Sequence, residues 1–258
     1  MAEKTALVLS AGGLFGAYQA GAWRELATRF RPDMVVATSV GALNGWAIAG
    51  GCPPEELIDQ WRNPVSAGFL RWRVPLVPWR GFFDAATFRA HLERLCTSYS
   101  PRLPFGVVIT DLTRLRSRLV ATPDLTCNHL AAACAIPFGL PPVRVDGRWC
   151  VDGGLLGALP LWAAAEMGAT HAVAIHALPL LPSRVLRGLV QIVRWLSPEH
   201  RYAGRLSVTM IAPRAPLGSL MDSTRWEKNR IDRWIELGAN DARSITINLL
   251  CPSIGSTV

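Results

Sequence analysis

Short uncharged runs recur along the chain, and their composition is typical of strands buried inside a sheet. They are rich in Val, Ile, Leu and Ala and show no clean polar alternation, as expected of parallel strands covered on both faces. Helix-like segments follow the first two of them. The pattern predicts a three-layer α/β/α sandwich with a mostly parallel central sheet. The predicted strands lie at residues 6–9, 34–37, 106–110, 172–176 and 208–212.

One part of the sheet is expected to be antiparallel. Residues 143–145 and 148–151 flank Asp146-Gly147, and this pattern predicts a β-hairpin. We find no internal repeat and no low-complexity linker, and a chain of 258 residues is long enough to bury one full core. The prediction is a single domain over 1–258, with a poorly ordered tail after Ile247.

A serine lies between the second predicted strand and a helix, in the sequence Ala37-Thr38-Ser39-Val40-Gly41. Small residues on both sides allow a tight turn, which presents the Ser39 hydroxyl at the carboxyl end of the sheet beside helix N-terminal amides. This is the position of a nucleophile in a G-x-S-x-G motif whose first glycine is replaced by Ala37. The alternative is a small-residue turn that only lets the helix pack on the strand.

A glycine-rich loop joins the first predicted strand to the helix at 17–23. Several backbone N–H groups of such a loop point into one space, where they bind an anion or a developing oxyanion. Two alternatives are a close-packed turn and a dinucleotide-binding loop, since Ala11-x-Gly13-x-x-Gly16 is similar to G-x-G-x-x-G. The dinucleotide interpretation is disfavoured, because its first glycine is alanine and the second strand does not end in a ribose-binding acid.

An aspartate follows a short strand in Val151-Asp152-Gly153-Gly154. A carboxylate in a glycine-flanked turn can approach a serine hydroxyl and, once desolvated, serve as a general base. Asp-Gly is also a common turn dipeptide. The order Ser39, Asp152, His176 matches an ordinary hydrolase triad as well, but a histidine at a strand end is more often structural or solvated.

These three motifs, in this order, resemble the signatures of the patatin-like phospholipase family. The resemblance covers residues 5–50 and 104–178, whereas about 60–103 carries no matching motif and is predicted to be a variable insertion. It implies a patatin-like fold and a Ser–Asp dyad without histidine, in which Ser39 attacks and Asp152 is the base. It also implies that an oxyanion hole is formed by the backbone amides of Gly12, Gly13 and Leu14.

The resemblance implies a serine lipid acyl hydrolase that cleaves carboxylic esters of phospholipids or related lipids, with no cofactor and no metal. Three positions depart from the family pattern: Ala11 and Ala37 replace glycines, and Phe15 stands where Arg or Lys is typical. The loss of that cation leaves open a neutral or single-chain ester substrate. A different function class also stays open, namely a catalytically weak membrane-associated binding protein of the same fold.

The formal net charge of +8 comes mostly from arginine. Around residues 69–83 arginines are interleaved with aromatic residues, a combination that suits an anionic lipid interface. An internal loop packed over the core is the alternative, and a surface or lid helix is predicted over 184–196. Nucleic acid is disfavoured as a partner because no binding motif accompanies the charge. The proposed interface residues are Arg71, Trp72, Arg73, Trp79, Arg80 and Phe82.

Two long uncharged stretches, 5–23 and 34–54, are interrupted by glycines where strand turns into helix, so they predict packed elements rather than membrane spans. The first four residues include an acid and do not resemble a secretory signal. The six cysteines are scattered without metal-ligand spacing. They predict reduced, buried thiols in a cytoplasmic protein. The basic aromatic segment around residues 69–83 adds the expectation of a peripheral position at a membrane.

Overall fold

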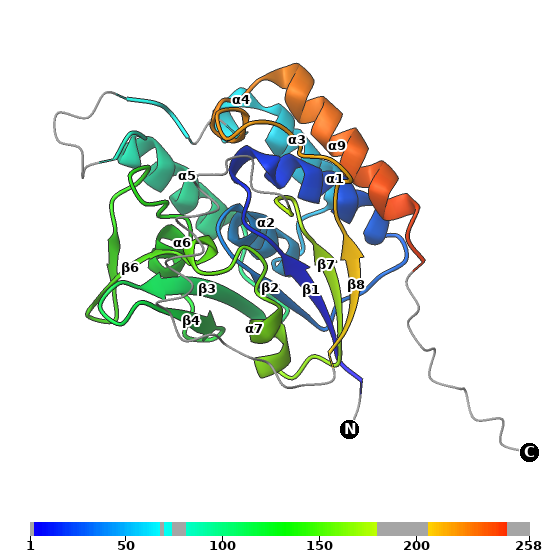
Figure 1. Ribbon diagram of the computed structural model, residues 1–258, viewed down its shortest axis with the longest axis horizontal. Helices are drawn as coiled ribbons and strands as arrows, with labels where there is room; N and C mark the ends of the chain where they lie inside the picture. Colours follow the sequence, from blue (N-terminus) through cyan, green and yellow to red (C-terminus); the bar gives the residue numbers. More distant parts are fainter. Residues whose placement is uncertain (1–2, 68–69, 74–80, 180–205, 247–258) are drawn as a thin grey trace, which may run out of the picture.

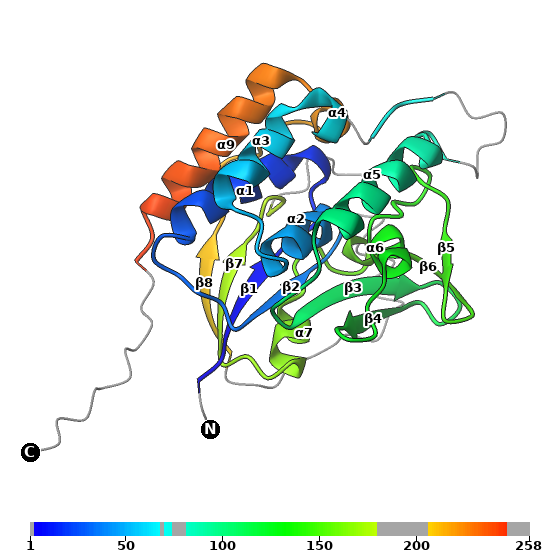
Figure 2. The same ribbon diagram turned by 180° about the vertical axis from the view of Figure 1, so that it is seen from behind.

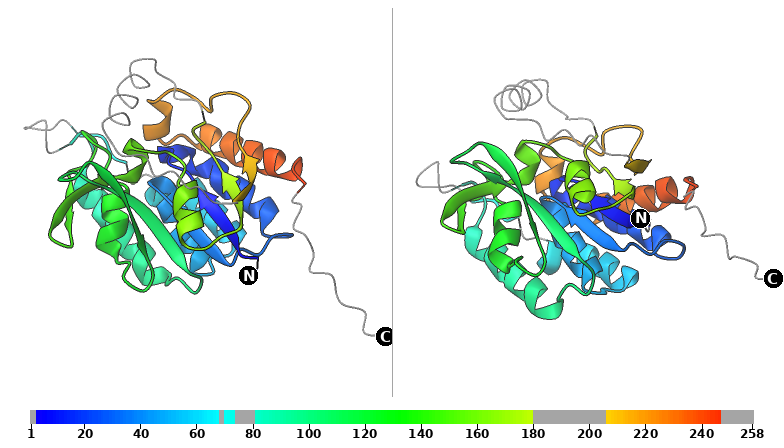
Figure 3. Two further views of the ribbon diagram at one scale, coloured as in Figure 1. Left: turned by 60° about the horizontal axis from the view of Figure 1, so that its bottom comes forward. Right: turned by 90° about the horizontal axis from the view of Figure 1, so that it is seen from below.

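A mixed β-sheet runs through the middle of the molecule. The computed structural model describes residues 3–67, 70–73, 81–179 and 206–246. Its strands are β1 (Thr5–Leu9), β2 (Met34–Ala37), β3 (Phe105–Asp111), β4 (Arg116–Ala121), β5 (Val143–Val145), β6 (Arg148–Asp152), β7 (His171–Ile175) and β8 (Ser207–Ile211). Within these residues they form one eight-stranded sheet in the order β5-β6-β3-β2-β1-β7-β8, with β4 paired to β3 outside this path. The β5–β6 hairpin and β8 lie at opposite ends of the sheet (Figure 3).

The five predicted strands correspond to β1, β2, β3, β7 and β8, which pair in parallel. The predicted hairpin is also present as β5 and β6. Its two turn residues have positive φ, 49° at Asp146 and 76° at Gly147, which is the backbone that an Asp-Gly hairpin turn requires. The antiparallel strand β4 was not predicted, because its sequence Arg-Ser-Arg-Leu-Val-Ala lies at a partly exposed edge and carries two arginines.

The two edges of β3 are used differently, and this difference brings distant parts of the chain together. Strand β4 occupies one edge along Gly106–Asp111. The other edge is shared: β2 pairs with residues 105–107 in parallel, and β6 pairs with residues 109–111 in antiparallel fashion. The carboxyl ends of β2 and β6 therefore point toward each other along one edge of β3.

Helices cover both faces of the sheet, so the predicted three-layer α/β/α sandwich is confirmed. Leu7 and Leu9 of β1 face one buried cluster, and the alternate residues Ala6 and Val8 face a second. Figure 1 views the sheet from the α7 side and Figure 2 from the α2 side. The helices are α1 (Gly16–Leu26), α2 (Val40–Ala49), α3 (Pro54–Arg62), α4 (Pro64–Ala67), α5 (Ala85–Ser98), α6 (Cys127–Ala133), α7 (Leu161–Glu166) and α9 (Lys228–Arg243), with short 3-10 turns η1 (Gly13–Phe15), η3 (Gly153–Leu155) and η4 (Asp222–Thr224).

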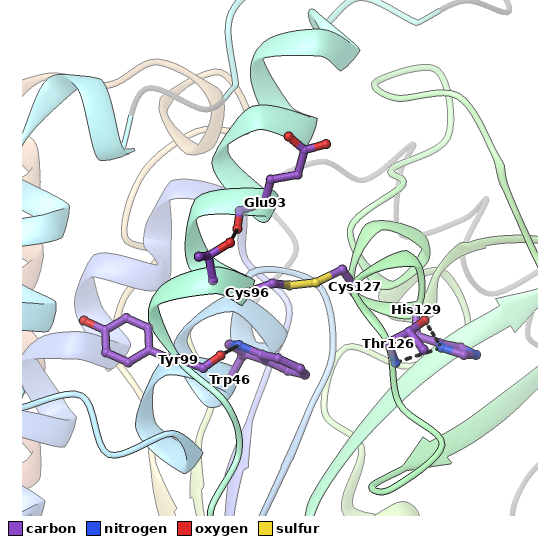
Figure 4. Close-up of a disulfide and its surroundings, with 8 residues drawn as sticks. Trp46, Glu93, Cys96, Tyr99, Thr126, Cys127 and His129 are labelled. Atoms are coloured by element: carbon purple, nitrogen blue, oxygen red, sulfur yellow. Dashed lines mark hydrogen bonds between the residues drawn. A yellow bond between two sulfur atoms is a disulfide. The ribbon is translucent and has the colours of Figure 1, made fainter.

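A disulfide joins α5 to the start of α6 (Figure 4). The prediction of six reduced thiols was therefore wrong for Cys96 and Cys127, whose Cα atoms are 6.4 Å apart. Sequence spacing could not show this pair, because 31 residues separate its members and the packing of α5 against α6 brings them together. Cys52, Cys134 and Cys150 are free and buried, as predicted. Cysteine usage as a whole thus no longer points to a reducing compartment.

Some predictions fall outside the described residues: the helix over 184–196, the side chains of Trp79 and Arg80, and the tail after Ile247. The single-domain assignment remains a prediction. Among the helices that the structure describes, none combines the length and the apolar character that crossing a bilayer requires.

Candidate active site

Ser39 sits at the sharp turn between β2 and α2 and has a backbone conformation that is rare for a residue with a side chain. Its φ is 54° and its ψ is −135°. Such a conformation costs roughly 1–3 kcal/mol and persists only where the surroundings fix it. Two contacts do so: the Thr38 hydroxyl donates to the Val108 carbonyl at 3.1 Å, and the Cys134 thiol donates to the Ser39 carbonyl at 3.1 Å.

Asp152 ends β6 and lies next to this serine. The Ser39 hydroxyl donates to Oδ2 of Asp152 at 2.5 Å, and the Gly154 amide donates to Oδ1 at 2.7 Å. The backbone of Asp152 is also fixed, since its amide donates to the Ala135 carbonyl and its carbonyl accepts from the Thr110 hydroxyl at 3.0 Å. Both Ser39 and Asp152 are buried, with 4% and 5% exposure. The shared edge of β3 explains how residues 113 positions apart meet.

The Asp152 carboxyl group is hard to ionise. Burial raises its pKa from 3.8 to about 7, although the hydrogen bonds from Ser39 and Gly154 act in the opposite direction by favouring the charged form. A carboxylate with a pKa near neutrality can take up a proton and return it within one catalytic cycle. The arrangement therefore provides a hydroxyl and an adjacent proton acceptor in a site largely closed to water.

The histidine of the alternative triad lies at the end of β7. Within the described part of the chain, the hydrogen-bond partners of the Asp152 carboxylate are Ser39 and Gly154, and neither is a histidine. His176 instead accepts from the Leu178 amide at Nδ1, and burial lowers its pKa to about 4. The described hydrogen bonds thus form a serine–aspartate pair that does not include His176.

The glycine-rich loop lies beside this pair. The amides of Gly12, Gly13 and Leu14 donate to no acceptor in the described ranges, whereas the Ala11 amide donates to the Ala158 carbonyl at 2.8 Å. The loop adjoins both other motifs: a Cβ on Gly12 would lie 4.0 Å from a methyl group of Val40, and one on Gly154 would lie 2.8 Å from the Ala11 Cβ. The loop therefore lies against both the serine turn and the turn that follows Asp152.

Gly13 is the position in this loop that requires glycine. Its φ is 57°, and a Cβ at this residue would lie 2.5 Å from the Ser223 carbonyl oxygen of η4. Ala11, by contrast, does not have a positive φ, so the alanine that replaces the family glycine there is accommodated without backbone strain.

A buried polar network anchors both ends of the glycine-rich loop. Gln19 of α1 donates to the Ser10 carbonyl at 2.7 Å, and Asn44 of α2 donates to the Gly16 carbonyl at 2.9 Å. Asn44 also donates to the Gln19 side-chain oxygen at 3.0 Å and accepts from the Trp61 indole at 3.0 Å. Sequence analysis missed Gln19 and Asn44, because a polar residue inside an apolar helix gives no sign of its partner.

Phe15, the third departure from the family pattern, is a core residue. It is 1% exposed, and its ring meets the ring of Trp234 edge-on with centroids 4.9 Å apart. Helix α9 thus packs beneath the glycine-rich loop through an aromatic pair, in the place where a cation is typical. In the described residues, no group of three or more His, Cys, Asp or Glu side chains is placed to hold a metal ion.

Comparison with known proteins identifies the family of this chain. The family model described as patatin-like phospholipase matches residues 7–165. This chain belongs to the patatin-like phospholipase family. The matched region contains the glycine-rich loop, Ser39 and Asp152, so the resemblance predicted from three short motifs is confirmed.

Individual members of the patatin-like phospholipase family are distant from this chain. Patatin-like phospholipase domain-containing protein 7 of Rattus norvegicus is 27% identical over 179 residues, which cover 66% of this chain and 13% of that protein. Lysophospholipase NTE1 of Mycosarcoma maydis is 27% identical over 183 residues, which cover 66% of this chain and 9% of that protein. The chain thus spans a small part of the length of these relatives.

Among solved structures, VipD from Legionella pneumophila superimposes with a TM-score of 0.53 at 14% identity, covering 94% of this chain and 66% of that one. At this identity the likeness concerns the fold alone.

Proposed function

We propose that this patatin-like protein is a serine lipid acyl hydrolase that uses a Ser39–Asp152 dyad. The observation that carries the proposal is the 2.5 Å hydrogen bond from the Ser39 hydroxyl to a buried carboxylate whose pKa is about 7. Membership of a family of phospholipases supports lipid esters as the substrate class.

In the proposed mechanism, Asp152 accepts the Ser39 proton as the serine oxygen attacks the ester carbonyl carbon. The carbonyl oxygen becomes an oxyanion, which the amides of Gly12, Gly13 and Leu14 stabilise by hydrogen bonding. The intermediate collapses, Asp152 gives its proton to the departing alcohol oxygen, and an acyl-serine remains. Water then attacks the acyl-serine, Asp152 takes its proton and returns it to Ser39, and a fatty acid leaves.

The absence of basic side chains in the glycine-rich loop limits the chemical groups that the loop can bind. No basic side chain stands between Ser10 and Gly16, since Phe15 occupies the position where a cation is typical. We therefore propose that the loop binds the ester carbonyl rather than a phosphate. A single-chain lysolipid is a suitable substrate class, and the name of the Mycosarcoma maydis relative, a lysophospholipase, agrees with it.

A fluorophosphonate probe, which forms a covalent bond with an activated serine, tests the proposal directly. The native chain should be labelled and should hydrolyse a water-soluble ester. Ser39→Ala should lose both properties, and Asp152→Asn should lose at least about 10³-fold in turnover, because nucleophile and base act as a unit. His176→Ala is the matched control and should keep most of the activity.

Unlabelled native protein with no ester turnover would contradict the proposal and favour the binding-protein alternative. A folded His176→Ala variant as inactive as Ser39→Ala would replace the dyad with a triad. Thermal unfolding of each variant separates loss of chemistry from loss of fold.

A further inference from the structure

Exposed apolar side chains occur on several segments that adjoin the candidate site. Six of the nine large hydrophobic residues that lie open to solvent in the described ranges belong to these segments, whereas the other three, Leu115, Trp149 and Met210, stand on the β3–β4 turn and on strands β6 and β8. We name the set of six the apolar rim. Its members are Val65 (69% exposed), Trp72 (42%), Phe82 (41%), Phe138 (75%), Leu220 (51%) and Met221 (49%).

One side of the apolar rim is built from two chain segments hydrogen-bonded to each other. The Phe82 amide donates to the Phe138 carbonyl at 2.9 Å, and the ring of Trp72 lies 6.4 Å from the ring of Phe82. Phe138 stands four residues after Cys134, whose thiol donates to the Ser39 carbonyl. This side of the rim is therefore joined to the serine turn through a short stretch of backbone.

The other side of the apolar rim is joined to the glycine-rich loop. Leu220 and Met221 directly precede η4, where the Ser223 carbonyl packs against Gly13. Figures 1 and 2 both show the short orange turn of η4 beside α4, at the same end of the molecule as the segment 70–73. Exposed apolar residues thus approach the candidate site from two directions.

Phe138 is held outward by an unusual backbone. Its φ is 63°, a conformation that is a genuine outlier for a bulky residue, and its ring is three-quarters exposed. Both features are unfavourable in water. Apolar side chains that are exposed together on a surface mark a site of contact with a protein or a membrane.

Positive charge accompanies the apolar rim. Exposed arginines flank both sides: Arg71 and Arg73 stand on either side of Trp72, and Arg214 and Arg225 lie a few residues before and after Leu220-Met221. The whole chain carries a formal charge of +8. Rings at headgroup level with arginines beside them match the requirements of an anionic bilayer surface rather than those of a neutral apolar partner.

We propose that the apolar rim docks this protein onto an anionic lipid surface, so that the Ser39 site faces the membrane. The inference names the partner of the proposed hydrolase and rests on that function only for the identity of the substrate. It extends the interface predicted around Trp72 and Phe82 to Phe138, Leu220 and Met221, which lie far from them in sequence.

Vesicle co-sedimentation of the full chain tests the rim. The vesicles are phosphatidylcholine alone and phosphatidylcholine mixed with phosphatidylglycerol. The native chain should bind the mixed vesicles more tightly, and added salt should weaken this binding. The triple variant Phe138→Asn/Leu220→Ser/Met221→Ser should bind at least about tenfold more weakly, because three apolar side chains no longer enter the interface. Asn suits position 138, since it tolerates positive φ.

Trp149→Ser is the matched control, because Trp149 is a large apolar residue with a similar exposure of 51% but stands on strand β6, which carries none of the six rim residues. This variant should bind the vesicles like the native chain. The proposal would be overturned if Trp149→Ser lost as much vesicle binding as the triple variant. It would also be overturned if the triple variant kept a native melting temperature and bound the vesicles like the native chain. A native dimer that dissociates in the triple variant would overturn it as well, since the rim would then be a contact between copies.

The Ser39→Ala variant keeps the two proposals apart. It should bind mixed vesicles like the native chain, because docking does not depend on the nucleophile. If the native chain binds vesicles but shows no ester turnover, the hydrolase proposal is rejected and the docking proposal stands. If turnover depends on Ser39 but the chain does not bind vesicles, the docking proposal is rejected and the hydrolase proposal stands.

Discussion

At the scale of single residues, the candidate site depends on how Asp152 is buried. The carboxylate accepts two hydrogen bonds, yet desolvation outweighs them and the pKa rises to about 7. A group with a raised pKa is protonated over more of the acidic range than a free aspartate is. The pH dependence of catalysis should therefore report the environment of this one side chain.

We expect kcat/KM for a water-soluble ester to rise with pH and to level off above about pH 7. Below that pH, Asp152 is protonated in the free enzyme and cannot accept the Ser39 proton, so the rate should fall about tenfold per pH unit. Stopped assays in a series of buffers give the profile, and melting temperatures at each pH exclude unfolding as the cause. A constant rate between pH 5 and pH 8 would show that this carboxyl group is not the base.

Asn44 should matter for turnover more than for substrate binding, because it anchors the end of the loop whose amides are proposed to hold the oxyanion. We expect Asn44→Ala to lower kcat at least about tenfold. Trp61→Phe is the control, since it removes the same Trp61–Asn44 hydrogen bond but leaves both Asn44 donors on the loop and on Gln19. Equal kcat values in the two folded variants would argue against a positioning role.

The local sequence identified Ser39 and Asp152 because each lies in a short motif whose small residues permit a tight turn. It did not identify Cys134 or Asn44. The thiol of Cys134 contacts Ser39 across 95 positions, and Asn44 reaches a loop 28 positions away. Such contacts depend on how helices pack, and no spacing in the sequence encodes that packing.

At the scale of elements, the parallel strands were predictable because they are apolar on both faces. Strand β4 and the pairing of β6 with β3 were not, since an edge strand with arginines resembles a loop and strand order leaves no local pattern. The same limit applies to η4, whose contact with the glycine-rich loop joins segments more than 200 positions apart.

The contact between η1 and η4 predicts different outcomes at two neighbouring glycines. Gly13→Ala should destabilise the fold by about 1–2 kcal/mol through its positive φ alone, and the clash with Ser223 should add to this. Gly12→Ala should unfold near the native midpoint, because a Cβ there meets its neighbours at an ordinary 3.4 Å. Urea unfolding measures the stability of both variants. Equal unfolding midpoints for Gly12→Ala and Gly13→Ala would show that η4 can move to accommodate the added methyl group without loss of stability.

At the scale of the whole molecule, one covalent link ties the helix α5 to the core. The Cys96–Cys127 disulfide closes a loop of 31 residues in the unfolded chain. Removing it with the double variant Cys96→Ser/Cys127→Ser should lower the free energy of unfolding by roughly 3–4 kcal/mol, mainly because the unfolded chain then has more conformational entropy. Urea unfolding of oxidised native protein against the variant gives the difference, and native protein under reductant should match the variant. An unchanged unfolding midpoint in the double variant would mean that the disulfide does not contribute to the stability of the fold.

The shared edge of β3 has a consequence for dividing this protein into pieces. Ser39 and Asp152 lie on opposite sides, in sequence, of the exposed turn at Leu115 between β3 and β4. A chain cut at that turn would leave the nucleophile on one fragment and the base on the other, with β3 retained beside the nucleophile. Ester turnover by the mixed fragments would then report that β6 had paired again with β3, since this pairing places Asp152 beside Ser39. A single reaction rate could thus serve as a readout of strand pairing, which suits this domain to split-reporter designs.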